Sequence, residues 1–289
     1  DKKIEKFSFK NKAEIDKAMK EVKFKKFFIN DISSKVVNRN PSGPFTTSTL
    51  QQVSSGRLGF GASRTMQIAQ KLYQGIEIDG ETIGLITYMR TDGTNLSTDA
   101  IDTFRKYIKN EFGDEYVPDN AASYSGKKAK NAQEAHEAIR PTDIMRAPGT
   151  IKKYLSPDQH KLYDLIWSRA LSSQMKPAQF DRNTITIISD DNGTICKASG
   201  SVIKFDGFLR VMKDTKKDED EDILPEMNKG PVNIEALLDE QHFTQPPPRY
   251  SEASLVKKLE ELGIGRPSTY ASIISVISTR GYAETINKS

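Results

Sequence analysis

This 289-residue sequence has a single cysteine and no long apolar run. The one cysteine, Cys196, excludes an internal disulfide and a cysteine-based zinc site, which fits a reducing cytoplasm. No apolar run approaches the ~20 residues that a helix needs to cross a bilayer, and the charged N-terminus is unlike a signal peptide, so we expect no membrane segment. Because the chain begins at Asp1 and not at methionine, we expect a fragment of a longer protein.

The sequence also has little net charge for its length. Its 43 lysines and arginines against 39 aspartates and glutamates give a net charge of +4, with an isoelectric point near 8.8. This balance indicates nucleic-acid binding only weakly. A chain of this length is expected to form about two or three domains, and it shows no internal repeat.

Hydrophobic spacing changes along the chain from mixed to helical and then to strand-like. The helices that this spacing predicts cover 11–22, 62–73, 98–112, a stretch from Pro157, and the regions after Ser251 and Pro267. The predicted strands cover 6–9, 27–37, 184–189, 194–197 and 202–211. Asp191-Asn192-Gly193 lies between two of these strands and is typical of a hairpin turn.

The segment from Ile86 to Asp92 combines a phenol, a guanidinium and a carboxylate at alternate positions. In an extended backbone Tyr88, Arg90 and Asp92 would project from one face. An ordinary phenol has a pKa of about 10 and needs a positive neighbour or a base to act as a nucleophile. Arginine binds phosphate in a bidentate, permanently charged way. The pattern fits attack on a phosphodiester, although most such triplets are half-buried strands with an ion pair.

ITYMRTD at 86–92 resembles the active-site segment of type IA DNA topoisomerases, in which the tyrosine forms a transient link to a broken DNA strand. Further segments resemble bacterial members of this family in the same order: FTTSTLQQ at 45–52, RLGFG at 57–61, NAQEAHEAIRPTD at 131–143, and QHFTQPPPRYSEASLVKKLEELGIGRPSTYASIIS at 241–275. The similarity covers nearly the whole chain. One position differs, since Gly93 replaces the serine that usually follows RTD.

The resemblance implies a multidomain α+β protein. Residues 1–46 and 177–244 would form two halves of a β-rich hinge domain. Residues 47–176 would form a mainly helical domain that carries the tyrosine and is inserted into the hinge domain, and residues 245–289 would begin a helical DNA-binding domain. The sequence by itself supports only the change from mixed to helical to strand character.

The same resemblance implies roles for individual residues. Tyr88 would be the nucleophile, Arg90 would hold the scissile phosphate, and His136 would lie near that phosphate as a catalytic residue. Without the resemblance, His136 is a helix-surface histidine, because HEAIR has Arg140 where a zinc-protease helix has its second histidine. The DNA-binding residues that we expect are Asp92, Arg140, Arg266, Ser268, Thr269, Lys127 and Lys128. Capping by Ser268 and a solvated loop at Lys127–Lys130 are the ordinary alternatives.

The resembled enzymes hold Mg²⁺ in a separate acidic Toprim domain, which nothing in this chain resembles. Asp218, Asp220 and Asp222 alternate in a charged run without a buried strand to present them, so we expect no metal site there. Mg²⁺ is therefore expected in the full-length enzyme with ligands outside this chain. We expect this fragment alone to be inactive in DNA cleavage.

The function implied is that of the central fragment of an ATP-independent enzyme. It would cleave one DNA strand through a 5′-phosphotyrosine link, pass a strand and religate, which relaxes negative supercoils. The expected partner is DNA, preferentially single-stranded, bound by a cytoplasmic, nucleoid-associated monomer. One alternative is a noncatalytic single-strand-binding module with Tyr88 as a stacking platform. A tyrosine recombinase is disfavoured, because its scattered arginine and histidine set with a C-terminal tyrosine is absent.

Overall fold

The computed structural model describes residues 8–124, 137–212, 224, 227–284 and 286. The chain forms two compact units, each made of three segments. Unit 1 comprises Asp1–Arg39, Gln179–Phe205 and Thr215–Pro248, and unit 2 comprises Asn40–Ala178, Asp206–Asp214 and Arg249–Ser289. Both helices and sheets are present, so the predicted mixed fold is confirmed. Among the described residues, no helix is long and apolar enough to cross a membrane.

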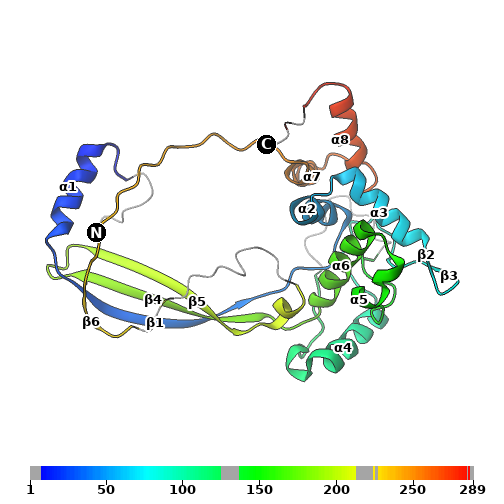
Figure 1. Ribbon diagram of the computed structural model, residues 1–289, viewed down its shortest axis with the longest axis horizontal. Helices are drawn as coiled ribbons and strands as arrows, with labels where there is room; N and C mark the ends of the chain where they lie inside the picture. The colour runs from blue at the N-terminus through cyan, green and yellow to red at the C-terminus, as the bar shows by residue number, and fades with distance from the viewer. Residues whose placement is uncertain (1–7, 125–136, 213–223, 225–226, 285, 287–289) are drawn as a thin grey trace. The chain divides into compact units, whose positions relative to one another are not determined.

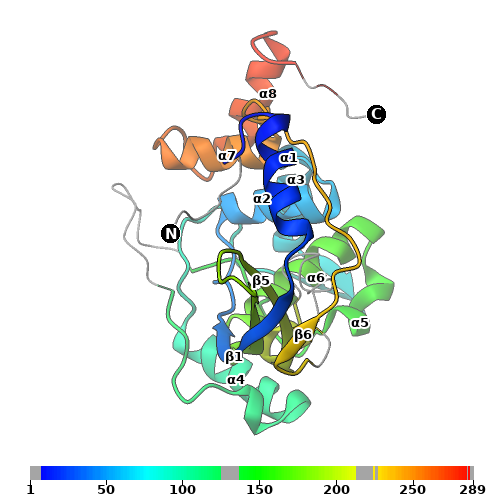
Figure 2. The ribbon, with the colours of Figure 1, turned by 90° about the vertical axis from the view of Figure 1, so that its left-hand side faces the viewer.

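Unit 1 contains a sheet with the strand order β5-β4-β1-β6 (Figure 1). The strands are β1 (Phe27–Arg39), β4 (Ala178–Ser189), β5 (Ile195–Phe205) and β6 (Gly230–Val232). β4 and β5 form the predicted antiparallel hairpin, and β6 pairs antiparallel with the start of β1 (Figure 2). The predicted helix near the N-terminus is α1 (Lys12–Lys23), whose N-cap Asn11 accepts a hydrogen bond from the Glu14 N–H. Segments far apart in the sequence therefore share one sheet.

The turn between β4 and β5 is held by a lysine that precedes β1. Asn192 has a φ of 55°, a left-handed conformation that asparagine tolerates better than most residues. The Asp191 carboxylate accepts a hydrogen bond from the Gly193 N–H at 2.9 Å and pairs with Lys25 Nζ at 2.8 Å. The hydrogen bond from Lys25 is the main reason that the pKa of Asp191 lies below its usual range. The hairpin predicted from Asp-Asn-Gly is thus fixed at its tip.

Unit 2 is mainly helical. Its first helices are α2 (Thr47–Leu58), α3 (Ala62–Gln74), α4 (Thr98–Phe112), α5 (Pro148–Ile151) and α6 (Pro157–Ser172), with short 3₁₀ turns η1 (Asp114–Tyr116), η2 (Lys152–Tyr154) and η3 (Gly207–Arg210). α4 follows its Ser97 cap and stops before Gly113, as predicted. α6 follows a capping box formed by Ser156 and Gln159. The buried side chains Leu50, Leu72, Phe104, Ile166 and Leu171 belong to these helices.

Two elements of the structure differ from the sequence-based prediction. A short hairpin of β2 (Ile76–Ile78) and β3 (Glu81–Ile83) was missed, although Asp79-Gly80 at its turn is a typical hairpin dipeptide. Residues 202–211 were predicted as a separate strand, which is wrong. Residues up to Phe205 continue β5, and Gly207–Arg210 form η3. Gly207 permits this change of direction with a φ of 49°.

The last two helices, α7 (Glu252–Glu261) and α8 (Tyr270–Thr279), pack in unit 2 (Figure 1). Val256, Leu259, Tyr270 and Ile274 form an apolar cluster with Ala62 of α3. Two carboxylates of α7 add polar contacts. Glu260 Oε2 accepts a hydrogen bond from Ser48 Oγ at 2.7 Å, and Glu252 Oε2 accepts one from the Ala62 N–H at 2.7 Å. The Glu252 carboxylate therefore caps α3, whose own N-cap residue is a glycine without a side-chain cap.

The units of the structure differ from the expected domains at three places. The segment 249–289, expected to begin a separate domain, belongs to unit 2 because α7 and α8 pack on α2 and α3. Residues 40–46 also belong to unit 2, where Phe45 is 1% exposed. Residues 206–214 return to unit 2, since Phe208 is buried there and its N–H donates to the Lys176 carbonyl. The assignment of these units to hinge and DNA-binding roles stays a prediction.

Candidate active site

Residues 86–92 form an irregular stretch, with an isolated bridge between Ile86 and Pro141. The expected regular strand is therefore absent, but exposure still alternates along the segment. Met89 and Thr91 are buried, whereas Tyr88 is 37% exposed and Arg90 is exposed. Asp92 is half-buried. The backbone thus turns Tyr88, Arg90 and Asp92 away from the core, as the spacing predicts.

Thr47, at the first turn of α2, fastens one side of this segment. Its Oγ1 donates to the Met89 carbonyl at 2.7 Å and accepts from the Thr91 N–H at 2.8 Å. Its own N–H donates to the Thr91 carbonyl at 2.9 Å. All three residues are at most 2% exposed, so these bonds lie in the core. The Met89 carbonyl and the Thr91 N–H, on either side of Arg90, are thereby hydrogen-bonded to the first residue of α2.

Residues 138–142 fasten the other side. The Thr87 N–H donates to the Arg140 carbonyl at 2.9 Å, and Thr87 Oγ1 donates to the Ala138 carbonyl at 2.8 Å. The same hydroxyl accepts from the Arg140 N–H at 3.0 Å. The Thr142 N–H donates to the Leu85 carbonyl at 3.0 Å. Tyr88 therefore directly follows a residue that three hydrogen bonds hold.

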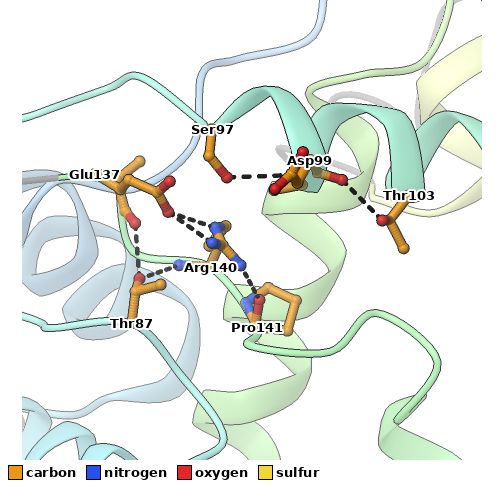
Figure 3. A network of polar contacts seen from close by, with 9 residues as sticks. Thr87, Ser97, Asp99, Thr103, Glu137, Arg140 and Pro141 are labelled. Carbon is orange, nitrogen blue, oxygen red and sulfur yellow. Dashed lines mark hydrogen bonds and ion pairs between the residues drawn. The ribbon is translucent and has the colours of Figure 1, made fainter.

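Arg140 is part of a polar network behind this segment (Figure 3). Its Nε and Nη2 each lie 2.7 Å from Oε2 of Glu137, and its Nη1 donates to the Pro141 carbonyl. Burial alone would raise the pKa of Glu137, but hydrogen bonds from Arg140 and Ser97 outweigh it and lower that pKa. The guanidinium is 16% exposed and engaged within the protein. The backbone of Arg140 thereby holds Thr87. A DNA contact of Arg140 stays a prediction.

Tyr88 lies against a second tyrosine. The rings of Tyr73, at the end of α3, and Tyr88 meet edge to face, with centroids 5.3 Å apart and planes at 65°. Both rings are partly exposed, at 41% and 37%. Sequence reasoning gave Tyr73 no role beyond the apolar face of its helix.

Arg90 is exposed and makes no hydrogen bond or ion pair within the described part of the chain. Its guanidinium is thus available to an anion from outside. The charge of Asp92 acts on a different group, the phenol of Tyr270 at the start of α8. Burial and then the charge of Glu260 raise the pKa of Tyr270, the charge of Arg266 lowers it, and that of Asp92 raises it. Asp92 and Arg266 therefore both act electrostatically on one phenol.

Arg266, Ser268 and Thr269 lie in the turn that precedes α8. Thr269 Oγ1 accepts from the Arg266 N–H at 2.8 Å and is thereby used inside the turn. Arg266 is exposed and donates Nη1 to the Gly265 carbonyl at 2.7 Å. Ser268 is exposed, and its hydroxyl makes no hydrogen bond to other described residues. Arg266 and Ser268 are therefore accessible to a ligand, whereas Thr269 mainly shapes the turn.

Several predicted residues cannot be placed. His136, Lys127 and Lys128 lie outside the described residues, as does the run with Asp218, Asp220 and Asp222. Tyr124, which precedes Lys127 and Lys128 in the sequence, is described. Its hydroxyl donates to the Ser173 carbonyl at 2.8 Å, and burial raises its pKa to about 12.

The described residues of this region do not form a metal site. Within the described ranges, no group of three or more histidine, cysteine, aspartate or glutamate side chains is arranged to hold a metal ion. Two nearby carboxylates, Glu137 and Glu260, are engaged by Arg140 and Ser48. The described residues do not fit a Mg²⁺ site.

Known proteins are similar to this chain in sequence and in structure. A family model described as DNA topoisomerase matches residues 1–289. The DNA topoisomerase 1 of Rickettsia typhi is 50% identical over 286 residues, covering 98% of this chain and 37% of the relative, and that of Haemophilus influenzae is 45% identical over 289 residues, covering 100% and 32%. The full-length topoisomerase I structure from Thermotoga maritima has a TM-score of 0.78 at 39% identity, over 99% of this chain and 45% of that one.

The chain belongs to the DNA topoisomerase family. It corresponds to a fragment of bacterial topoisomerase I, because it spans only about a third to two fifths of the length of the curated relatives that it matches.

Replacing Thr47 by valine tests whether its hydroxyl holds the Tyr88 segment. Valine keeps the shape but leaves the Met89 carbonyl and the Thr91 N–H without this partner in the core. We expect the free energy of unfolding of this chain to fall by about 1–3 kcal/mol in a denaturant titration. Thr103→Val is the matched control, because the Thr103 hydroxyl bonds to the Asp99 carbonyl on an exposed helix surface. Equal losses for the two variants would contradict a special role for Thr47.

Proposed function

We propose that this chain is the central part of a type IA DNA topoisomerase and that Tyr88 is its nucleophile. The observation that carries the proposal is the arrangement of residues 86–92. Thr47 and residues 138–142 hold the backbone from both sides, while Tyr88 and Arg90 face outward. A nucleophile beside an accessible guanidinium is the arrangement that attack on a phosphodiester needs.

In the proposed reaction, the Tyr88 Oη attacks a backbone phosphorus atom. A bond forms between Oη and phosphorus, and the bond between phosphorus and the 3′ oxygen breaks. The phenol gives its proton to water, and the leaving 3′ oxygen takes up a proton from water. The products are a 5′-phosphotyrosine ester and a free 3′-hydroxyl, and religation is the reverse step. Because the new ester is similar in energy to the bond that it replaces, the cycle needs no ATP. Arg90 would hold the phosphate and offset the charge that builds up in the transition state.

Mg²⁺ remains a proposal for the whole enzyme and rests on family resemblance. The described residues do not offer a metal site, so the ligands of the ion would lie outside this chain. The proposed catalytic role of His136 also rests on the resemblance. An imidazolium there would pair with the phosphate or with Asp92.

A DNA strand would contact the turn before α8 in addition to Arg90. Arg266 and Ser268 are exposed in that turn, and Arg266 and Asp92 both lie close enough to Tyr270 to change its pKa. We propose that Arg266 and Ser268 bind the DNA backbone and that Thr269 orients them. Arg140 acts through Thr87 in this scheme, because its donors are engaged by Glu137 and Pro141. DNA contacts of Lys127 and Lys128 stay predictions.

The whole enzyme would relax negative supercoils by cutting one strand, passing another through the gap and resealing the cut. Its preference for single-stranded DNA, its monomeric state and its place in the nucleoid stay predictions. Asp92 would line the strand's path next to Arg90, with Gly93 in the position where related enzymes usually have serine. The Gly93 N–H donates to Thr91 Oγ1 at 2.9 Å, so the backbone of the segment is still fixed there.

Tyr88→Phe in the full-length enzyme removes the nucleophilic oxygen and keeps the ring. We expect strand cleavage to be abolished and single-strand affinity to stay nearly unchanged, measured by covalent adduct formation and by filter binding. A covalent adduct in the phenylalanine variant would identify another residue as the nucleophile. A wild-type enzyme that binds strands but never forms an adduct would favour the noncatalytic binding module.

Arg90→Lys keeps the positive charge but loses the planar, two-donor guanidinium. We expect the cleavage and religation rates to fall by about tenfold or more, the loss of roughly one charge-assisted hydrogen bond. The half-saturating DNA concentration should change much less. Single-turnover kinetics at several DNA concentrations separate the two effects. Near-wild-type rates for the lysine variant would show that Arg90 supplies charge only.

This fragment alone should bind single-stranded DNA weakly, with an affinity that falls as salt rises. It should not cut the strand, since a phenol needs a base to become a good nucleophile, and Arg90 neither accepts that proton nor protonates the leaving group. The measurement is incubation with 5′-labelled and 3′-labelled strands and Mg²⁺, followed by denaturing electrophoresis. Efficient adduct formation would mean that residues 1–289 hold the complete catalytic machinery.

A further inference from the structure

The end of α3 lies unusually close to the backbone that leads into Tyr88. The Leu85 N–H donates to the Leu72 carbonyl at 2.8 Å. A Cβ on Gly84 would lie 2.8 Å from the Tyr73 carbonyl oxygen, which is too close for a side chain. Glycine at position 84 is therefore what permits this approach. Since Leu72 is fully buried, the backbone at Leu72 and Tyr73 has a fixed position. It contacts Gly84 and Leu85, which precede Tyr88 by four and three residues in the sequence.

The Tyr73 side chain contacts the side chain of Tyr88. Its ring meets the Tyr88 ring edge to face at 5.3 Å, and its hydroxyl makes no hydrogen bond to other described residues. At 41% exposure it contributes little to the core. A half-exposed aromatic ring with this geometry limits the directions that its neighbour takes.

We propose that Tyr73 is a positioning residue for the nucleophile Tyr88 and that it acts through the edge-to-face contact between the two rings. This inference rests on the proposed role of Tyr88 and extends it. Thr47 and Thr87 fix the backbone on both sides of Tyr88, whereas Tyr73 contacts the Tyr88 ring itself. Tyr73 restricts the ring itself, so that Oη points to the phosphate in a larger fraction of molecules. Tyr73 does not touch the reacting atoms in this scheme.

The test compares three variants of the full-length enzyme. Tyr73→Phe keeps the ring and removes the hydroxyl, and Tyr73→Leu keeps an apolar side chain and removes the ring. Tyr107→Leu is the matched control, because it removes a similar edge-to-face pair with Trp167 at 5.6 Å, away from the Tyr88 segment. Single-turnover cleavage of a labelled single strand with Mg²⁺ gives the maximal rate and the half-saturating DNA concentration. Thermal unfolding shows that each variant is folded.

For Tyr73→Leu we expect the maximal cleavage rate to fall by about three- to tenfold, the range that one aromatic pair supplies, with the half-saturating concentration unchanged. Tyr73→Phe and Tyr107→Leu should cleave at the wild-type rate. A wild-type rate for Tyr73→Leu would overturn the proposal. So would an effect confined to the half-saturating concentration, which would make Tyr73 a DNA-binding residue. An equal loss in Tyr73→Phe would assign the effect to the hydroxyl and also overturn it.

The same assay separates this inference from the proposed function. If Tyr88→Phe still forms an adduct, Tyr88 is not the nucleophile and both proposals fail. If Tyr88→Phe forms none and Tyr73→Leu cleaves normally, only the positioning role of Tyr73 fails.

Discussion

The hydroxyl of Thr47 is the contact on which the candidate site depends most. It joins the first turn of α2 to the Met89 carbonyl and the Thr91 N–H, and all of these groups are removed from water. A buried backbone group without a partner costs about 1–3 kcal/mol, so loss of the hydroxyl would destabilise this irregular segment by about that amount. Arg90 lies between the two bonded residues and is directed outward as a consequence.

The other side of Tyr88 is held by a charged pair that faces inward. Glu137 takes up the guanidinium of Arg140, and the backbone of Arg140 then holds Thr87 (Figure 3). The two arginines of the site therefore differ in their surroundings. The side chain of Arg140 is 16% exposed and paired with Glu137, whereas Arg90 is exposed and accessible to an anion from outside. Burial and pairing, and not residue type, decide which arginine is available to a ligand.

Local signals in the sequence predicted much of this structure. The Ser97 and Ser156 caps and the Asp-Asn-Gly turn gave elements that were confirmed. Alternation placed Tyr88, Arg90 and Asp92 on the outer side correctly. Partners distant in the sequence could not be predicted. The bonds of Thr47 span 42 and 44 residues, and the resemblance at 45–52 indicated only that this motif matters. The pairing of Arg140 with Glu137 was missed because HEAIR was interpreted as part of a helix, whereas residues 137–140 are not helical. The close approach of Tyr73 depends on Gly84, and this effect becomes visible only when the backbones at positions 73 and 84 are both placed in space.

The central claim is that Tyr88, in the hydrogen-bonded segment 86–92, forms the covalent link to DNA. The most direct measurement traps the adduct of the full-length enzyme with an oligonucleotide, digests the protein and sequences the nucleotide-linked peptide by mass spectrometry. The account predicts a 5′-phosphate on Tyr88 within the peptide that contains ITYMRTD. A nucleotide attached to any other residue, or a link through a 3′-phosphate, would contradict it.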